Sequence, residues 1–119
     1  MRLACLLLLV LCAPVAAEEE TETFSGNFKR GEARAHSGHD LEIKGRRIIM
    51  RDFRCPDPAT ERGRDAKALM NQFLRTNITC VMVRDGEDWV GDCWANDKNV
   101  TDSMTSTGLC IGVGARPSI

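Results

Sequence analysis

The order of apolar and polar positions along this chain predicts a small fold of strands and two helices. From residue 31 to residue 53, short apolar stretches are separated by turns at residues 37–38 and 44–46, which predicts three strands. Over Thr60–Thr76, apolar side chains recur at three- and four-residue steps, a pattern typical of an amphipathic helix. Further strands are predicted at Ile78–Val83 and Trp89–Trp94, and a short helix at Val100–Thr107. The fold class is therefore α+β, mainly β.

The N-terminal residues have the composition of a secretory signal peptide. Arg2 precedes the apolar run Leu3–Cys12, and small residues follow it up to Ala17. The run is about ten residues long, whereas a membrane-spanning helix needs about 20. We expect cleavage near Ala17 and a secreted or periplasmic protein that does not span the membrane. Residues 18–30 then form a flexible leader, residues 31–111 the domain, and residues 112–119 an irregular tail.

The charge balance argues weakly against a protein that binds nucleic acid through its net charge alone. The chain has 16 Lys and Arg residues, 17 Asp and Glu residues and a net charge of -1. Nucleic-acid-binding domains usually carry a basic excess. The charge is uneven, however, because five cations lie in one short segment: Lys44, Arg46, Arg47, Arg51 and Arg54. A local anion-binding surface therefore stays open.

Four of the six cysteines remain after removal of the signal peptide, namely Cys55, Cys80, Cys93 and Cys110. An even number in an exported domain predicts two disulfides, for which three pairings exist. A zinc site is disfavoured, because no two of these cysteines have C-x-x-C spacing and both histidines lie elsewhere.

The segment from His36 to Asp57 (HSGHDLEIKGRRIIMRDFRCPD) resembles the first half of the staphylococcal nuclease (thermonuclease) family. That family has an Asp-Gly-Asp-Thr turn, a strand, a Gly turn, an Arg-bearing strand and then Asp-x-Pro-Glu. Here the turn is Ser37-Gly38-His39-Asp40, and the closing segment is Arg54-Cys55-Pro56-Asp57. The resemblance extends from about Ala33 to Ile111. It implies a five-stranded OB-fold barrel with an inserted amphipathic helix and a short C-terminal helix.

The resemblance also implies where a calcium-dependent nuclease would carry its acids, and most of them are replaced. The first acid of the family turn falls on Ser37, the second on His39, and a later aspartate ligand on Arg54. Calcium needs hard oxygen ligands, which imidazole and guanidinium do not supply. Only Asp57, at the position of the family's general-base glutamate, is a conservative match.

The two arginines that stabilise phosphoryl charge in the family are also replaced, the first by Ile49 and the second by Asp88. Loss of a single preorganised donor typically costs about 10²–10³ in rate. Arg47 and Arg51 flank Ile49 on the same side of the strand. With Arg54 they are candidates for binding an anion, although a solvated face or ion pairs with nearby acids would explain them as well. A relocated phosphodiesterase site that uses neighbouring aspartates and His39 is a further alternative.

The predicted strands favour one disulfide pairing. Cys80 and Cys93 lie on consecutive strands joined by a short turn, which leaves Cys55 to pair with Cys110. On the scaffold that the resemblance implies, the segments of the latter two residues lie near each other beside the catalytic pocket. Trp94 is expected in the core. Trp89 is expected either in the barrel wall or exposed, where it would stack on a ligand.

These observations favour an exported, thermonuclease-like domain that is catalytically inactive and acts as a binding or accessory module. Its partner would be nucleic acid or another anionic polymer, and it would need no cofactor or metal. One alternative is a calcium-dependent nuclease with a rearranged site, which hydrolyses DNA or RNA. Another is a structural protein-interaction domain. The sequons at Asn77 and Asn99 do not separate these hypotheses.

Overall fold

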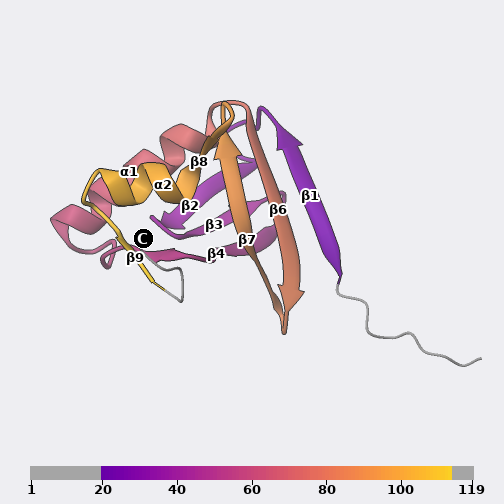
Figure 1. Ribbon diagram of the computed structural model, residues 1–119. Helices are drawn as coiled ribbons and strands as arrows, with labels where there is room; N and C mark the ends of the chain where they lie inside the picture. Colours follow the sequence, from indigo (N-terminus) through magenta and orange to yellow (C-terminus); the bar gives the residue numbers. More distant parts are fainter. Residues whose placement is uncertain (1–19, 114–119) are drawn as a thin grey trace, which may run out of the picture.

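The computed structural model describes residues 20–113, in which a mixed β-sheet packs against two helices (Figure 1). The strands are β1 Thr21–Gly26, β2 Ala33–Ser37, β3 Asp40–Ile43, β4 Arg46–Met50, β5 Phe53–Arg54, β6 Ile78–Asp85, β7 Asp88–Ala95, β8 Lys98–Asn99 and β9 Ile111–Gly112. The helices are α1 Glu61–Leu74 and α2 Val100–Ser106. The main sheet has the order β1-β6-β7-β4-β3-β2, with β8 on β7, and β5 pairs with β9. The predicted α+β class, mainly β, is confirmed.

Local turn chemistry explains the first three strands of the predicted domain. β2, β3 and β4 are antiparallel neighbours, and the β3–β4 turn places Lys44 (φ 52°) and Gly45 (φ 82°) in the left-handed region. Glycine adopts this conformation without the cost that a Cβ brings. After β4 the chain passes through α1 and returns as β6 and β7, which form an antiparallel hairpin. As a result, β7 pairs with β4 in parallel, with Ile48 opposite Trp89.

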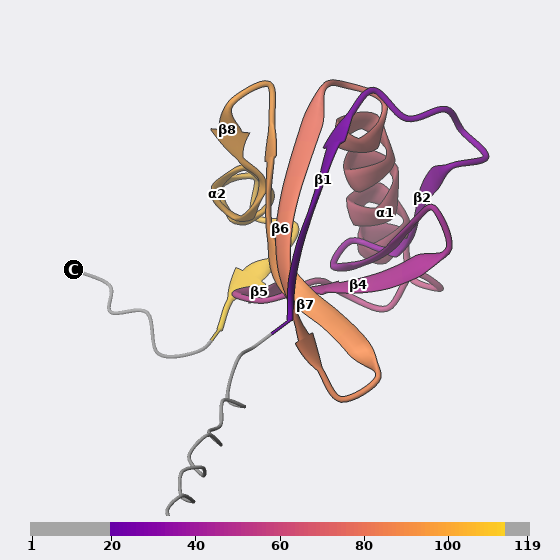
Figure 2. The same ribbon diagram turned by 90° about the vertical axis from the view of Figure 1, so that its right-hand side faces the viewer.

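Helix α1 begins at a side-chain cap and buries one face. The hydroxyl of Thr60 accepts a hydrogen bond from the backbone N–H of Gly63 at 3.0 Å, which satisfies one free donor of the first turn. Ala66, Met70 and Leu74 are fully buried at four-residue intervals, as the periodicity predicts. Figure 2 shows α1 running beside β2, and the two elements are in contact along their length.

The inward faces of β6 and β7 carry the centre of the core. Cys80 and Cys93 lie opposite each other in register and form a disulfide that is fully buried. Because alternate residues of a strand face the same side, Trp89 shares the inward side with Cys93 and is only 6% exposed. Trp94 has the opposite parity and is half-buried. The expectation that Trp94 is the core tryptophan is therefore wrong.

The expected closed five-stranded barrel differs from the open sheet that the structure shows. β1 and β2 form its two edges, and in the described part of the chain no strand pairing joins them. The chain between them turns through the Lys29 carbonyl, which accepts the N–H groups of Glu32 and Ala33. β1 therefore pairs with β6 while β2 pairs with β3, and the sheet stays open between them.

Residues 18–30 were predicted to be a flexible leader, but Thr21–Gly26 within them form strand β1 of the main sheet. Its inward positions, Glu22, Phe24 and Gly26, alternate with exposed ones, and Phe24 packs against the core. This strand could not be predicted from an apolar pattern, because five of its six residues are polar or glycine and it lies at the edge of the sheet. Residues 112–119 were predicted to be an irregular tail, but Gly112 belongs to strand β9 and pairs with Phe53. The signal peptide and residues 114–119 lie outside the described residues.

The second disulfide joins Cys55 to Cys110 across 55 residues of chain, so both expected pairings are confirmed. It lies next to the β5–β9 pair, in which Arg54 is opposite Ile111. No helix within residues 20–113 is long and apolar enough to cross a membrane. Two disulfides fit a secreted protein.

Candidate functional site

The turn between β2 and β3 contains two of the positions at which the family resemblance expects acids. Ser37 is 7% exposed, and its hydroxyl accepts the backbone N–H of His39 at 3.3 Å. His39 is half-buried, and its Nδ1 accepts the backbone N–H of Cys55 at 3.0 Å. This ring nitrogen is therefore an unprotonated acceptor, and the imidazole serves to hold the start of the Cys55 segment against the turn.

The imidazole of His39 is disfavoured as a cation. Burial lowers the pKa of His39 below its ordinary value of 6.5, and the positive charge of Arg54 lowers it further. The carboxylate of Asp40 raises this pKa by less than the other two effects lower it. The structure thus brings together His39 and Arg54, two positions at which the family resemblance expects acidic metal ligands.

The Cys55–Cys110 disulfide lies directly against this turn. A Cβ atom on Gly38 would lie 2.5 Å from Cys55 Sγ and 2.9 Å from the Cβ of Ala66 in α1. Glycine is therefore required at residue 38 by the close approach of the disulfide and helix. The space beside the turn is filled by covalently fixed protein atoms.

The nearest carboxylate of this region is already neutralised. Both oxygens of Asp40 accept hydrogen bonds from Arg47, each at 2.6 Å, in a bidentate pair. The hydrogen bonds to Asp40 raise the pKa of Arg47, and the charge of Asp88 contributes in the same direction. Arg47 is accordingly an ion-pair partner, one of the interpretations open from the sequence. Asp40 and Ile49 are opposite each other in the β3–β4 pair.

Asp57, the one conservative match, has a local structural role. Its Oδ1 accepts the backbone N–H of Ala59 at 2.8 Å, and its carbonyl oxygen accepts the hydroxyl of Thr60 at 2.7 Å. These bonds form the turn that leads into α1. Arg51 and Arg54 are exposed, and the backbone N–H of Arg51 bonds to Gly91.

The arrangement does not fit calcium. Within residues 20–113, no three or more His, Cys, Asp or Glu side chains form a group that could hold a metal ion. Hard cations need several converging oxygens. Here the imidazole of His39 accepts a backbone N–H, Asp40 is paired with Arg47, and Asp57 builds the turn before α1.

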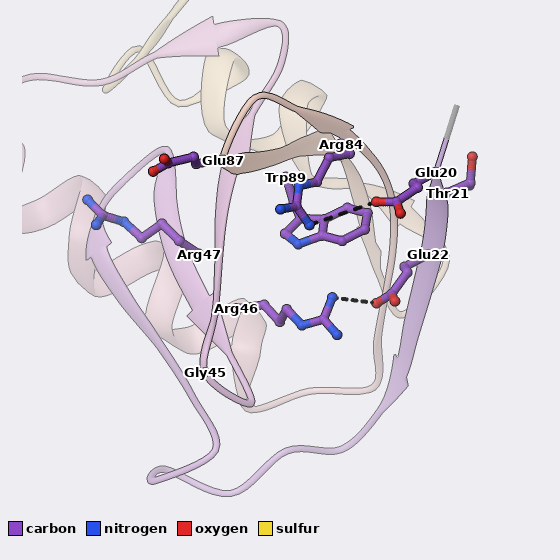
Figure 3. A pocket seen from close by; sticks show the side chains of 9 residues that line it. All are labelled: Glu20, Thr21, Glu22, Gly45, Arg46, Arg47, Arg84, Glu87 and Trp89. Carbon is purple, nitrogen blue, oxygen red and sulfur yellow. Dashed lines mark hydrogen bonds and ion pairs between the residues drawn. The ribbon is translucent and has the colours of Figure 1, made fainter. Parts of the chain in front are cut away.

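A hollow lies between β1, the β3–β4 turn and the end of the β6–β7 hairpin (Figure 3). Trp89, which the sequence offered as a residue that would stack on a ligand, lines it. It has a volume of about 570 Å³. The guanidinium groups of Arg46 and Arg84 lie 5.3 Å and 5.2 Å from the ring centre of Trp89. Arg46 also pairs with Glu22 at 2.9 Å, and Arg84 with Glu20 at 3.8 Å.

Two ion pairs border this Trp89 hollow: Arg46–Glu22 joins β4 to β1, and Arg84–Glu20 joins β6 to the residue before β1. Figure 3 shows the guanidinium of Arg84 over the indole, that of Arg46 beside it and directed to Glu22, and Arg47 directed away from the ring. The cations of the hollow are balanced by acids, because three Arg and three Glu residues line it. Arg46, Arg84 and the indole of Trp89 form a structural cluster at the wall of this hollow, which we call the plug, and the hollow lacks the excess positive charge that anion binding requires.

The chain was also compared with known proteins. No protein-family model matches this chain, and no curated protein matches it either.

Proposed function

We propose that this protein is an exported, divergent thermonuclease-like domain that has no metal-dependent nuclease activity and acts as a binding module. The order of elements supports the OB-type assignment: a β2-β3-β4 meander, helix α1, the β6-β7 hairpin, and a parallel β4–β7 pair. β1 and β2 would together represent the first, bent strand of such a barrel, since one pairs with β6 and the other with β3.

The observation that carries the proposal is the state of the β2–β3 turn. In a nuclease of this type, the turn would present acids to a calcium ion, but here it holds His39, whose Nδ1 binds the N–H of Cys55. The Cys55–Cys110 disulfide packs on Gly38 of the same turn. The covalent bond stabilises this region of the fold, while Ser37 and His39, at two of the positions that would hold the metal, are used for hydrogen bonds within the protein.

Calcium titration by calorimetry tests the proposal, with hydrolysis of denatured DNA followed on the same sample of mature, disulfide-bonded protein. We expect no heat of calcium binding and no cleavage above the buffer control. Calcium-dependent cleavage that Asp57→Ala abolishes would refute the proposal and would establish the rearranged nuclease. A fold control is needed for that variant, because Asp57 builds the turn before α1.

A further inference from the structure

A basic groove runs between α1 and the β2 side of the molecule. Two adjoining hollows of about 540 Å³ and 360 Å³ share Lys67, Ala68 and Asn71 of the helix, and together we call them the α1–β2 groove. The cations that line it are Arg30, Arg34, Arg64, Lys67 and Arg75. No Asp or Glu residue of the described chain lines either hollow. The groove is therefore lined by five cations, of which Arg34 also has an acid nearby in Glu42.

The cations are concentrated in this groove although the chain as a whole has a net charge of -1. Five of the 16 Lys and Arg residues line the groove. Among these five, Arg34 lies near an acid, Glu42, whose oxygen is 3.6 Å from Arg34 but only 3.0 Å from His36. Arg34 has a 64% exposed side chain, and a surface ion pair of this kind is weak. A ligand anion can therefore compete for the guanidinium of Arg34.

The walls of the groove are fixed by hydrogen bonds that leave other donors for a ligand. Arg75 donates to the carbonyls of Phe28 (3.1 Å) and Ala33, so it attaches the chain before β2 to the helix. The Oδ1 of Asn71 accepts the N–H of Ala35 at 2.9 Å. The amide NH₂ group of Asn71 remains as a donor on the floor of the groove.

We propose that the α1–β2 groove binds an acidic polysaccharide, through carboxylate or sulfate groups on its arginines and lysine and through sugar hydroxyls on its amides. This inference deepens, and rests on, the proposed role as a binding module. Planar guanidinium groups match oxyanions in bidentate geometry, and four of the five cations are arginines. Asn71 and Gln72 supply neutral donors and acceptors between the charges.

The lining favours a sugar chain over the other polyanions. Single-stranded nucleic acid is usually held by aromatic side chains on which the bases stack, and no aromatic residue among those described lines the groove. A membrane surface is flat, whereas this site is concave. From Arg64 to Arg75 the helix rises about 16 Å, which suits an extended chain that contacts several cations in turn. An exported protein meets acidic polysaccharides outside the cell.

Binding of three probes to the mature protein tests the site and the ligand class. The probes are a heparin oligosaccharide, an oligogalacturonate of similar length, and single-stranded oligothymidylate, each titrated by calorimetry at two salt concentrations. We expect salt-sensitive binding of at least one acidic sugar, and weaker binding of oligothymidylate. In the variant Arg30→Gln/Lys67→Gln, the sugar should bind about tenfold or more weakly, since two charged contacts are lost.

A matched control is Lys44→Gln/Lys98→Gln, which removes two exposed cations that do not line the groove. It should bind the sugar as the unmodified protein does, and both variants should melt at the temperature of the parent. Equal affinity in the groove variant and the parent would refute the site while leaving the binding role intact. Preference for oligothymidylate, or no binding of either sugar, would refute the ligand class. Calcium-dependent cleavage, measured separately, would instead contradict the proposed function.

Discussion

Removal of the Cys55–Cys110 disulfide should cost this domain much of its stability. The bond closes a loop of 55 residues, and the chain-entropy relation then gives about 4 kcal/mol at 25 °C, because the unfolded chain gains the freedom of that loop. A typical domain has about 5–15 kcal/mol in total. The double variant Cys55→Ala/Cys110→Ala should therefore lose about 4 kcal/mol, measured as the free energy of unfolding from urea titration.

The other disulfide provides the comparison. Cys80–Cys93 closes 13 residues, and the same relation gives about 3 kcal/mol for its loop. Cys80→Ala/Cys93→Ala also removes two fully buried sulfur atoms from the core, so its total cost should exceed this loop value. A loss below about 1 kcal/mol for the Cys55–Cys110 variant, with an unchanged dependence on urea, would refute the loop-closure reasoning.

Three further predictions address the turn, the helix and the plug. Gly63→Ala should lower the free energy of unfolding, measured by urea titration, by about 2 kcal/mol or more, since its Cβ would clash with the carbonyl oxygen of Asp57. Gly31→Ala should not lower it, because a Cβ at residue 31 would meet open space. Burial lowers the pKa of His39, so the unfolded chain binds more protons than the folded chain, and native stability is lost as the pH falls below about 6.5. His39→Asn should lessen this loss of stability between pH 7 and pH 5. An unchanged dependence of the free energy of unfolding on pH would contradict the prediction. Arg46→Met should lower the free energy of unfolding by about 1 kcal/mol, because the variant loses the indole contact and the ion pair with Glu22. The loss should exceed that of the exposed Arg51→Met, and equal losses would show that the plug does not stabilise the fold.

The elements that could be predicted are those in which the spacing of apolar positions repeats over several helical turns or strand positions. Helix α1 was expected at Thr60–Thr76 and spans Glu61–Leu74, because its buried face has four-residue spacing and its first residue follows a threonine cap. Strands β1, β5, β8 and β9 were missed. The last three have two residues each, too short for any alternation, and β1 has a polar exposed face.

The parts of the candidate site that could be predicted are those that depend on the order of the strands and the number of cysteines. The Cys80–Cys93 pair followed from strand order and Cys55–Cys110 by elimination. The position of Cys93 also fixes the parity of β7: Cys93 points inward, so Trp89 does too. This consequence was available from the sequence, and the wrong assignment of Trp94 came from reading it by resemblance instead. The α1–β2 groove was not available, because Arg30 and Arg75 are far apart in sequence and meet only when the chain before β2 folds against α1.

The two disulfides act on different parts of the fold, and this separates stability from binding. Cys80–Cys93 joins strands that already pair, so it reinforces the core. Cys55–Cys110 instead fixes the β2–β3 turn, where His39 accepts the N–H of Cys55 and Gly38 touches the sulfur. A metal site needs acids that can converge on an ion, and a turn held in this way by sulfur, imidazole and glycine has none to offer. A ligand of the proposed binding module would then bind elsewhere on the surface, and the α1–β2 groove gathers five cations there.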